Sequence, residues 1–224
     1  MKGPKFVAKQ SWRTTYIISQ EANGLSRLLV SPLPRTNPTM ESLALSRGHG
    51  SRAFQVRYHD WRMDMAVTDL STGQQLYSLS GGSLGSTLTA TNSANVVVGT
   101  GRTSCMTTSV TVTMTGAAGG AAGSFETHTG KLLGGSPKFN SPAFGGQLMT
   151  WKNKALSTKI NYTLMGEDGL ALAKFESAGM KFKKVGKLEI IDAVQDQAQI
   201  DEIVVTVLTL LYRKLVEMNT VALV

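Results

Sequence analysis

The sequence predicts a mainly β protein, a closed antiparallel β-barrel of about twelve strands around a central hydrophobic C-terminal α-helix. Short runs of β-branched and aromatic residues, bounded by turn residues, recur through most of the 224-residue chain. The last of these runs precedes a segment that is apolar almost all round. A helix that is apolar on every side has to be surrounded by protein or lipid. We therefore expect the strands to close around this helix and to use it as their core.

The helix is predicted over residues 200–218. Its uninterrupted apolar run, Ile203 to Tyr212, is 10 residues long, whereas spanning a bilayer takes about 20 residues. We therefore expect the helix to lie in a protein core and not across a membrane. Charged residues at both ends are expected to complement the helix dipole, with acidic residues at the start and basic residues at the end: Asp201, Glu202, Arg213 and Lys214.

The strand candidates are short and closely spaced. A barrel wide enough to admit a helix needs more than the eight strands that side chains alone can fill. The first two candidates are predicted to form a hairpin with Asn23 and Gly24 at its turn. In chain order the candidates are 14–19, 25–30, 53–58, 63–67, 74–79, 87–91, 95–98, 109–115, 144–152, 159–164, 170–176 and 185–191.

We expect a single domain over residues 1–224. The stretch 81–124 is rich in Gly, Ala, Ser and Thr and contains one charged residue, Arg102. Its end, residues 116–123, has low complexity and is predicted to be a mobile loop between strands. The Gly-Thr-Gly sequence at 99–101 lacks the third glycine of a dinucleotide-binding fingerprint, so we do not assign it to a nucleotide.

Composition limits the compartment and the partners. The formal charge of +8 and the pI near 9.7 indicate an anionic partner, either phospholipid headgroups or nucleic acid, although plain solubility explains such a charge equally well. Cys105 is the only cysteine, which favours a reducing compartment. The N-terminus has no apolar stretch of signal-peptide length. We expect a cytoplasmic protein.

The C-terminal third resembles the tubby C-terminal-like superfamily, and the short fungal members most of all. Three segments carry the resemblance: Gly169 to Glu176, Lys184 to Ile190, and Asp201 to Lys214. The superfamily also includes the phospholipid scramblases and the LURP-one-related proteins. The resemblance implies a closed barrel of about twelve strands around a hydrophobic C-terminal helix. For the tubby branch it further implies binding to phosphoinositides through surface lysines and arginines, with a proposed role in transcription.

Two basic clusters are the candidate ligand-binding residues. Alternate residues of a strand share a face, so Lys181 and Lys183 are expected to point together. Two such clusters side by side could hold an anionic headgroup, with each lysine contributing about 1 kcal/mol near an acidic surface. Solvated strand edges also use lysine, to prevent edge-to-edge aggregation. The candidates are Lys152, Lys154 and Lys159 in one cluster and Lys181, Lys183, Lys184 and Lys187 in the other.

Catalytic and metal sites are not predicted, and no cofactor is expected. His49, His59 and His128 are scattered, and no Cys-x-x-Cys or His-x-x-x-His spacing accompanies them. His59 and Asp60 are adjacent, and adjacent residues on a strand face opposite ways, so they are poorly placed to bond directly. The expected function is therefore an intracellular, non-enzymatic module that binds anionic phospholipid, peripheral at the plasma membrane. The alternatives are a nucleic-acid-binding protein, a partner of another protein, and a ligand carrier or enzyme with a pocket at the barrel mouth.

Overall fold

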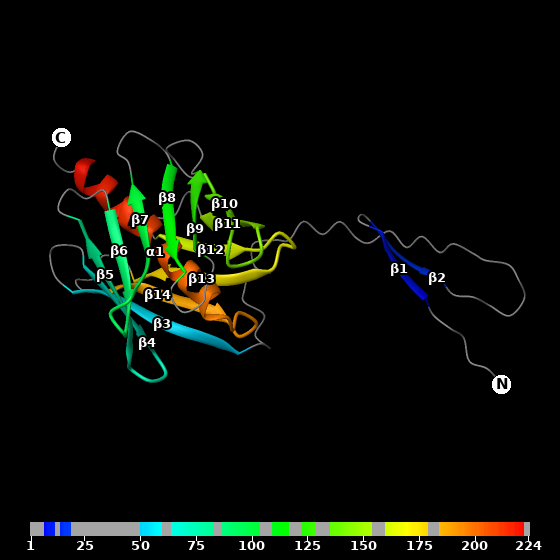
Figure 1. The fold of residues 1–224 in the computed structure, drawn as a ribbon, viewed down its shortest axis with the longest axis horizontal. Helices are drawn as coiled ribbons and strands as arrows, with labels where there is room; N and C mark the ends of the chain where they lie inside the picture. Colours follow the sequence, from blue (N-terminus) through cyan, green and yellow to red (C-terminus); the bar gives the residue numbers. More distant parts are fainter. Residues whose placement is uncertain are drawn as a thin grey trace, which may run out of the picture. The chain divides into compact units, whose positions relative to one another are not determined.

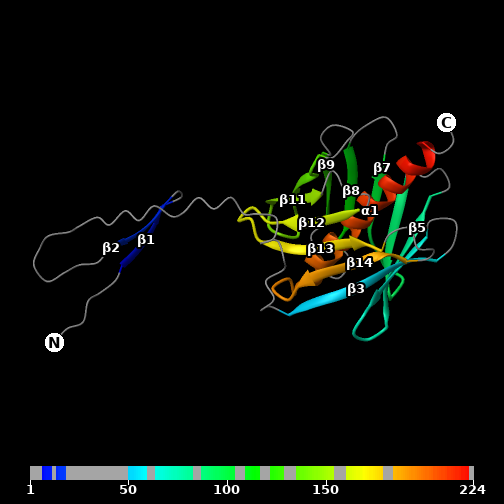
Figure 2. The same ribbon diagram turned by 180° about the vertical axis from the view of Figure 1, so that it is seen from behind.

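The computed structural model describes residues 7–11, 14–18, 50–59, 64–82, 87–103, 109–116, 122–128, 135–153, 160–178 and 184–221. Twelve antiparallel strands form a closed barrel, and one helix runs through it (Figure 1). The predicted fold class is confirmed. Around the barrel the strands follow the order β10-β11-β12-β13-β14-β3-β4-β5-β6-β7-β8-β9 (Figure 2). Every pair of neighbouring strands except β14 and β3 is therefore also consecutive in the chain.

The barrel strands are short and joined mostly by tight connections. Their bounds are β3 (Ser51–Tyr58), β4 (Met65–Asp69), β5 (Gln75–Gly81), β6 (Thr87–Asn92), β7 (Val97–Thr103), β8 (Ser109–Thr115), β9 (Ala122–His128), β10 (Lys138–Ser141), β11 (Gln147–Asn153), β12 (Asn161–Met165), β13 (Ala171–Ser177) and β14 (Lys184–Ile191).

The N-terminal residues form a separate unit, 1–42, in which the structure describes one hairpin. Strand β1 (Val7–Ser11) pairs with β2 (Thr14–Ile18). The sequence did not predict this pairing of β2 with the segment before it. The predicted partner, residues 25–30, and the Asn23–Gly24 turn lie outside the described residues, so the predicted hairpin stays a prediction. The second unit, residues 43–224, contains the barrel. A single domain over the whole chain stays a prediction.

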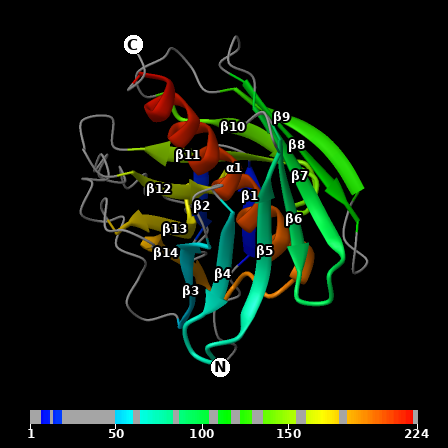
Figure 3. The same ribbon diagram turned by 90° about the vertical axis from the view of Figure 1, so that its left-hand side faces the viewer.

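Helix α1 (Gln197–Val221) occupies the interior of the barrel (Figure 3). Every residue from Ile200 to Tyr212 is buried, and strand residues of alternating position pack against them, among them Phe54, Trp151 and Phe175, which are fully buried. The core is therefore one cluster that contains the inward side of the strands and all sides of the helix. No helix in the described part of the chain is long and apolar enough to cross a membrane.

The helix begins one turn earlier than predicted, which changes the role of its acids. Asp196 caps the helix, because its Oδ1 accepts a hydrogen bond of 3.0 Å from the Ala198 N–H. Asp201 and Glu202 lie in the second turn and are 4% and 1% exposed. They are therefore not dipole-complementing surface acids. Arg213 and Lys214 were expected toward the C-terminal end of the helix, but the helix continues to Val221 and its last turn has no basic residue.

Both buried acids are bound to the barrel wall by neutral donors. The Tyr77 hydroxyl on β5 donates to Asp201 Oδ1 over 2.7 Å, and Gln197 Nε2 donates to the same oxygen over 2.6 Å. On another side of the barrel, the Ser141 hydroxyl at the end of β10 donates to Glu202 Oε1, and the Ala143 N–H donates to Glu202 Oε2 over 3.0 Å. The two carboxylates thus attach the start of the helix to two different strands.

Strand β7 begins later than predicted. Asn95, which the sequence placed in the strand, has a φ of 60° and lies in the turn before it. The Asn92 side chain organises this turn by accepting hydrogen bonds of 3.0 Å from the Ala94 and Val96 N–H groups. Similarly, β11 begins at Gln147, because Gly145 and Gly146 have positive φ angles and form the turn after β10.

The low-charge stretch 81–124 forms β6, β7 and β8 and the beginning of β9. Its predicted loop is shorter than residues 116–123, since Ala122 and Gly123 already belong to β9. Residues 117–121 lie outside the described part. On the outer side of these strands, Thr89, Thr100 and Thr113 lie directly opposite one another in register. This part of the barrel surface therefore has hydroxyl groups where the rest of the barrel has charges.

Candidate anion-binding face

Four lysines point outward from the strands on the other side of the barrel. In β10 and β11, Lys138 and Lys152 alternate with the buried Phe139 and Trp151. Lys174 on β13 and Lys187 on β14 alternate in the same way with buried core residues. We call the outer side of β10 to β14, with Lys138, Lys152, Lys174 and Lys187, the lysine face. Its residues point away from the core because strand side chains alternate between core and solvent; Lys138, Lys152 and Lys187 are exposed and Lys174 is half-buried.

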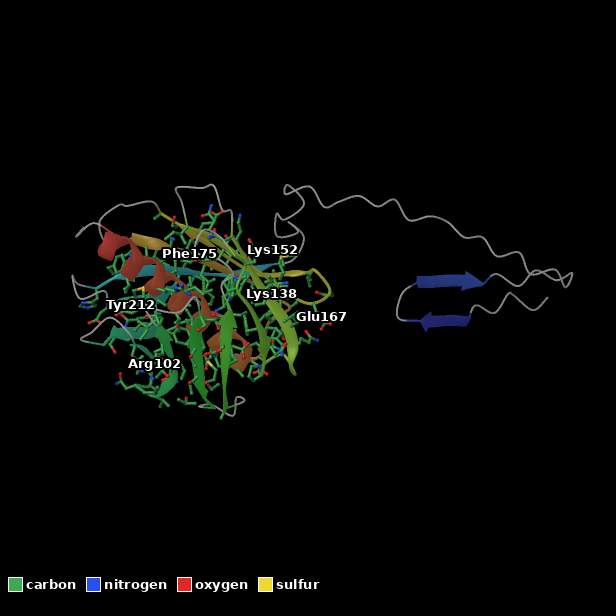
Figure 4. The ribbon with its side chains drawn as sticks, turned by 90° about the horizontal axis from the view of Figure 1, so that it is seen from above. Arg102, Lys138, Lys152, Glu167, Phe175 and Tyr212 are labelled. Atoms are coloured by element: carbon green, nitrogen blue, oxygen red, sulfur yellow. The ribbon has the colours of Figure 1, made fainter. Side chains whose placement is uncertain are left out.

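The strand register places Lys138 next to Lys152. Lys138 lies opposite Thr150, two residues before Lys152, so the two lysines are diagonal neighbours. Such neighbours have Cα atoms about 7–8 Å apart, within reach of one ligand for long side chains. Figure 4 shows both lysines together on the outside of the barrel, with Arg102 on a different part of the surface. Lys152 is also opposite Thr163, which is opposite Lys174.

Two of the four lysines are neutralised by neighbouring glutamates. Lys174 Nζ lies 2.6 Å from Glu176 Oε1, and Lys187 Nζ lies 2.5 Å from Glu189 Oε1. The register makes the same four residues cross-strand neighbours, because Lys174 is opposite Glu189 and Glu176 is opposite Lys187. They form a block without net charge. Lys138 and Lys152 have no ion-pair partner among the described residues and therefore carry the free positive charge of the lysine face.

Of the seven predicted lysines, two can be placed with their side chains. Lys152 is exposed on the lysine face, and Lys187 is exposed but paired with Glu189. Lys184 is the first residue of β14 and is opposite Arg57 in register; its side chain is not described. The remaining predictions, Lys154, Lys159, Lys181 and Lys183, lie outside the described residues. The two clusters as predicted therefore stay predictions.

Sequence reasoning missed Lys138 and Lys174. Lys138 was missed because β10 is only four residues long and was not predicted as a strand. The alternation Lys-Phe-Asn-Ser was its one signal, since it places Lys138 on the side opposite Phe139. Lys174 lies within the predicted strand 170–176 and is half-buried beside Glu176.

Acidic residues gather at one end of the barrel. We call the end where α1 begins the entry end and the opposite end the exit end. Turns and strand ends at the entry end bring together Asp69, Glu167, Asp168, Asp192 and Asp196. Lys138 begins β10 at the exit end, and Lys152 is the second-last residue of β11 at that end. The pair Lys138–Lys152 thus lies away from the acidic turns of the entry end.

Asp69 is the one entry-end acid that is both buried and paired. Ser71 donates to Asp69 Oδ1 through its hydroxyl over 2.6 Å and through its N–H over 2.8 Å, and Arg52 Nε donates to Oδ2 over 2.9 Å. These bonds, the Ser71 hydroxyl foremost and the Arg52 charge after it, lower the pKa of Asp69 from 3.8 to about 2. The group holds the β4–β5 turn and belongs to the structure of the barrel.

The catalytic and metal alternatives receive no support from geometry. His59 is exposed, and its backbone N–H donates to the backbone carbonyl of Asp64 over 2.7 Å, which is a turn contact. Asp60 and Cys105 lie outside the described residues. Within the described ranges, no group of three or more His, Cys, Asp or Glu side chains is arranged to hold a metal ion.

Comparisons with known proteins identify no relative. No protein-family description, curated protein or solved structure matches the chain.

Proposed function

We propose that this protein is a peripheral binding module for anionic phospholipid headgroups, and that the lysine face is its contact surface. One observation carries the proposal: Lys138 and Lys152 are adjacent, exposed and free of carboxylate partners within the described residues. Near an acidic membrane each lysine contributes on the order of 1 kcal/mol. Lys174 and Lys187 contribute less, because their glutamate partners already neutralise them.

We further propose that the chain is a member of the tubby C-terminal-like superfamily. The support is the twelve-stranded barrel with a hydrophobic C-terminal helix inside, which is the fold that the resemblance implies. On this proposal the preferred headgroup is a phosphoinositide and the site of action is the cytoplasmic side of the plasma membrane. We propose a binding module and not an enzyme, since α1 fills the interior of the barrel with side chains.

Co-sedimentation with vesicles tests the lysine face. Vesicles of neutral phosphatidylcholine, of added phosphatidylserine and of added phosphoinositide are compared at two salt concentrations. The variant Lys138→Gln/Lys152→Gln removes both free charges. We expect its affinity for the phosphoinositide vesicles to fall by about 2 kcal/mol, roughly 30-fold. Its melting temperature should not change, because both side chains are exposed.

A second variant of equal net charge separates local recognition from overall charge. Arg102→Gln/Lys187→Gln removes one cation from β7 and one that is already paired on β14. We expect it to retain most of the wild-type affinity. Equal losses in both variants would show that only net charge matters. Binding to no vesicle, with salt-sensitive binding to nucleic acid instead, would reject the phospholipid proposal in favour of nucleic acid.

A further inference from the structure

The barrel is closed unevenly, and its weakest junction lies between β9 and β10. Each of the other eleven pairs of neighbouring strands is held by at least four register pairs. Among the described residues, strands β9 and β10 share one, Lys138 with His128, at the exit end. From there to the entry end, β9 is paired along its whole length with β8 only.

Side chains fill this junction where backbone pairing is missing. The rings of Phe125 on β9 and Phe139 on β10 stack with their centroids 4.7 Å apart and an interplanar angle of 14°. Nearer the entry end, a β-carbon built on Gly123 would lie 3.3 Å from Pro142 Cγ, so β9 and the turn after β10 are in close contact. These contacts are non-directional, and they cannot hold two strands together as a hydrogen-bonded ladder does.

The free end of β10 is instead bonded to the helix. Glu202 accepts from the Ser141 hydroxyl and from the Ala143 N–H, and Ser141 Oγ in turn accepts a hydrogen bond of 3.0 Å from the Phe144 N–H. One carboxylate therefore organises the last residue of β10 and the turn that follows. Glu202 is 1% exposed and belongs to a helix that is fixed on all sides.

We propose that the barrel opens locally between β9 and β10, and that the Glu202 carboxyl group, in place of strand pairing, controls how often it opens. Opening separates Phe125 from Phe139 and admits water to Glu202. It turns β9 and β10 into edge strands, held by β8 and by β11 on one side only, so that their backbone amides exchange more readily. The inference is independent of the proposed membrane function, because it depends on the Glu202 carboxyl group and on no lysine charge.

The charge state of Glu202 gives the opening a pH dependence. Burial raises the pKa of the Glu202 carboxyl group, and the hydrogen bonds from Ser141 and Ala143 offset this rise in part. Water reaches the group in the open junction and restores its ordinary pKa. Protonation therefore favours the closed junction, and ionisation, as the pH rises above the ordinary glutamate range, favours the open one.

The surroundings of Glu202 contain no compensating cation in the described part of the chain. From the helix itself, the nearest titratable group is Asp201, whose carboxylate is bonded to Tyr77 of β5 and to Gln197. Arg52 pairs with Asp69. Strand β10 and its turn contribute Ser141, Ala143 and Phe144, which do not titrate, and β9 contributes Phe125 and Thr127 on its inward side.

Hydrogen exchange of the full-length protein, followed by mass spectrometry, tests the proposal. The quantity measured is the ratio of the protection factor of the backbone amides in β9 and β10 to that in β3 and β14. Strands β3 and β14 share seven register pairs and serve as the reference. In the wild type this ratio should be low and should fall further between pH 5 and pH 8, after correction for intrinsic exchange. Glu202→Gln removes the charge. Its amide oxygen can still accept from the Ala143 N–H, and its amide N–H can donate to Ser141 Oγ in place of the bond that Ser141 donates to Glu202. It should raise the ratio and remove its pH dependence.

Glu202→Ala should act in the opposite direction, with protection of β9 and β10 lowered roughly tenfold, because two buried donors lose their acceptor. Asp201→Asn is the matched control, since it neutralises the adjacent buried acid without touching β10; its effect should not be confined to β9 and β10. A wild-type ratio near one, or a pH dependence that persists in Glu202→Gln, would overturn the proposal. Glu202→Gln and the wild-type pH series decide the matter even where Glu202→Ala does not fold.

Discussion

Gly101 of β7 lies directly against Thr209 of the central helix. A β-carbon built on Gly101 would lie 2.1 Å from Thr209 Oγ1 and 2.7 Å from Thr209 Cβ. One turn earlier on the helix, a β-carbon on Gly99 would lie 3.3 Å from Val205 Cγ1. The Gly-Thr-Gly sequence therefore allows the helix to approach the barrel wall closely, and this packing explains glycines that resemble part of a nucleotide motif.

Gly101→Ala is expected to destabilise the protein by about 1–3 kcal/mol, because the added methyl group overpacks a core that has no room to relax. Thr209 cannot easily turn away, since its hydroxyl donates to the Val205 carbonyl over 2.6 Å inside the helix. Urea denaturation monitored by tryptophan fluorescence measures the change. Thr100→Ala, on the outer side of the same strand, should change the free energy of unfolding by less than about 0.5 kcal/mol. Equal effects of the two substitutions would contradict the close packing.

The helix and the barrel could be predicted because both depend on hydrophobic pattern. Ile203 to Tyr212 is uncharged and apolar apart from Thr206 and Thr209, and alternation in segments such as 53–58 and 185–191 marks strands with one buried side. Strands β9 and β10 could not be predicted in this way. The first begins in a glycine- and alanine-rich stretch, and the second has four residues, of which only Phe139 is a large apolar one.

The candidate site was predicted only in part, because its charge depends on pairing across strands. Lys152 follows from alternation with Trp151, whereas Lys138 depends on a strand that the sequence did not indicate. The neutralisation of Lys187 had a local signal, since Lys187 and Glu189 are two residues apart on one strand and share a side. The number of lysines in a segment does not show which of them are paired with a glutamate.

Tyr77→Phe is expected to destabilise the protein by about 1–3 kcal/mol, because Asp201 is buried and would lose a hydrogen-bond donor. Burial first, and the adjacent Asp201 carboxylate second, raise the pKa of Tyr77, so its hydroxyl stays protonated and remains a donor throughout the neutral range. Denaturant unfolding at pH 7 provides the measurement.

A change at Asp201 tests whether its charge strengthens this hydrogen bond. Tyr77→Phe in an Asp201→Asn background removes the same hydroxyl beside a neutral side chain. We expect a smaller loss there, since hydrogen bonds to charged groups are the stronger ones. A loss that is identical in the two backgrounds would show that the charge of Asp201 does not strengthen this hydrogen bond.

Asp69 is expected to give the fold a stability that depends on acid pH. The pKa of Asp69 is lowered from 3.8 to about 2 in the folded protein, so the folded state favours the ionised form. Its contribution is fully present above the unfolded pKa and is lost as the pH falls from about 4 through 2. At neutral pH the contribution should be on the order of 1–2 kcal/mol, reduced by solvent screening because Arg52 remains 43% exposed.

Asp69→Asn therefore should lower the free energy of unfolding at pH 6 and have a progressively smaller effect toward pH 2.5. Urea titrations of both proteins across this range measure the difference. Asp168→Asn removes the same charge from an exposed turn residue and serves as the control; its effect should be small at every pH. If the ionised Asp69 holds the β4–β5 turn, the free energies of unfolding of the wild type and of Asp69→Asn converge at low pH. A difference that persists there, where the wild-type carboxyl group is protonated, would indicate a purely steric loss.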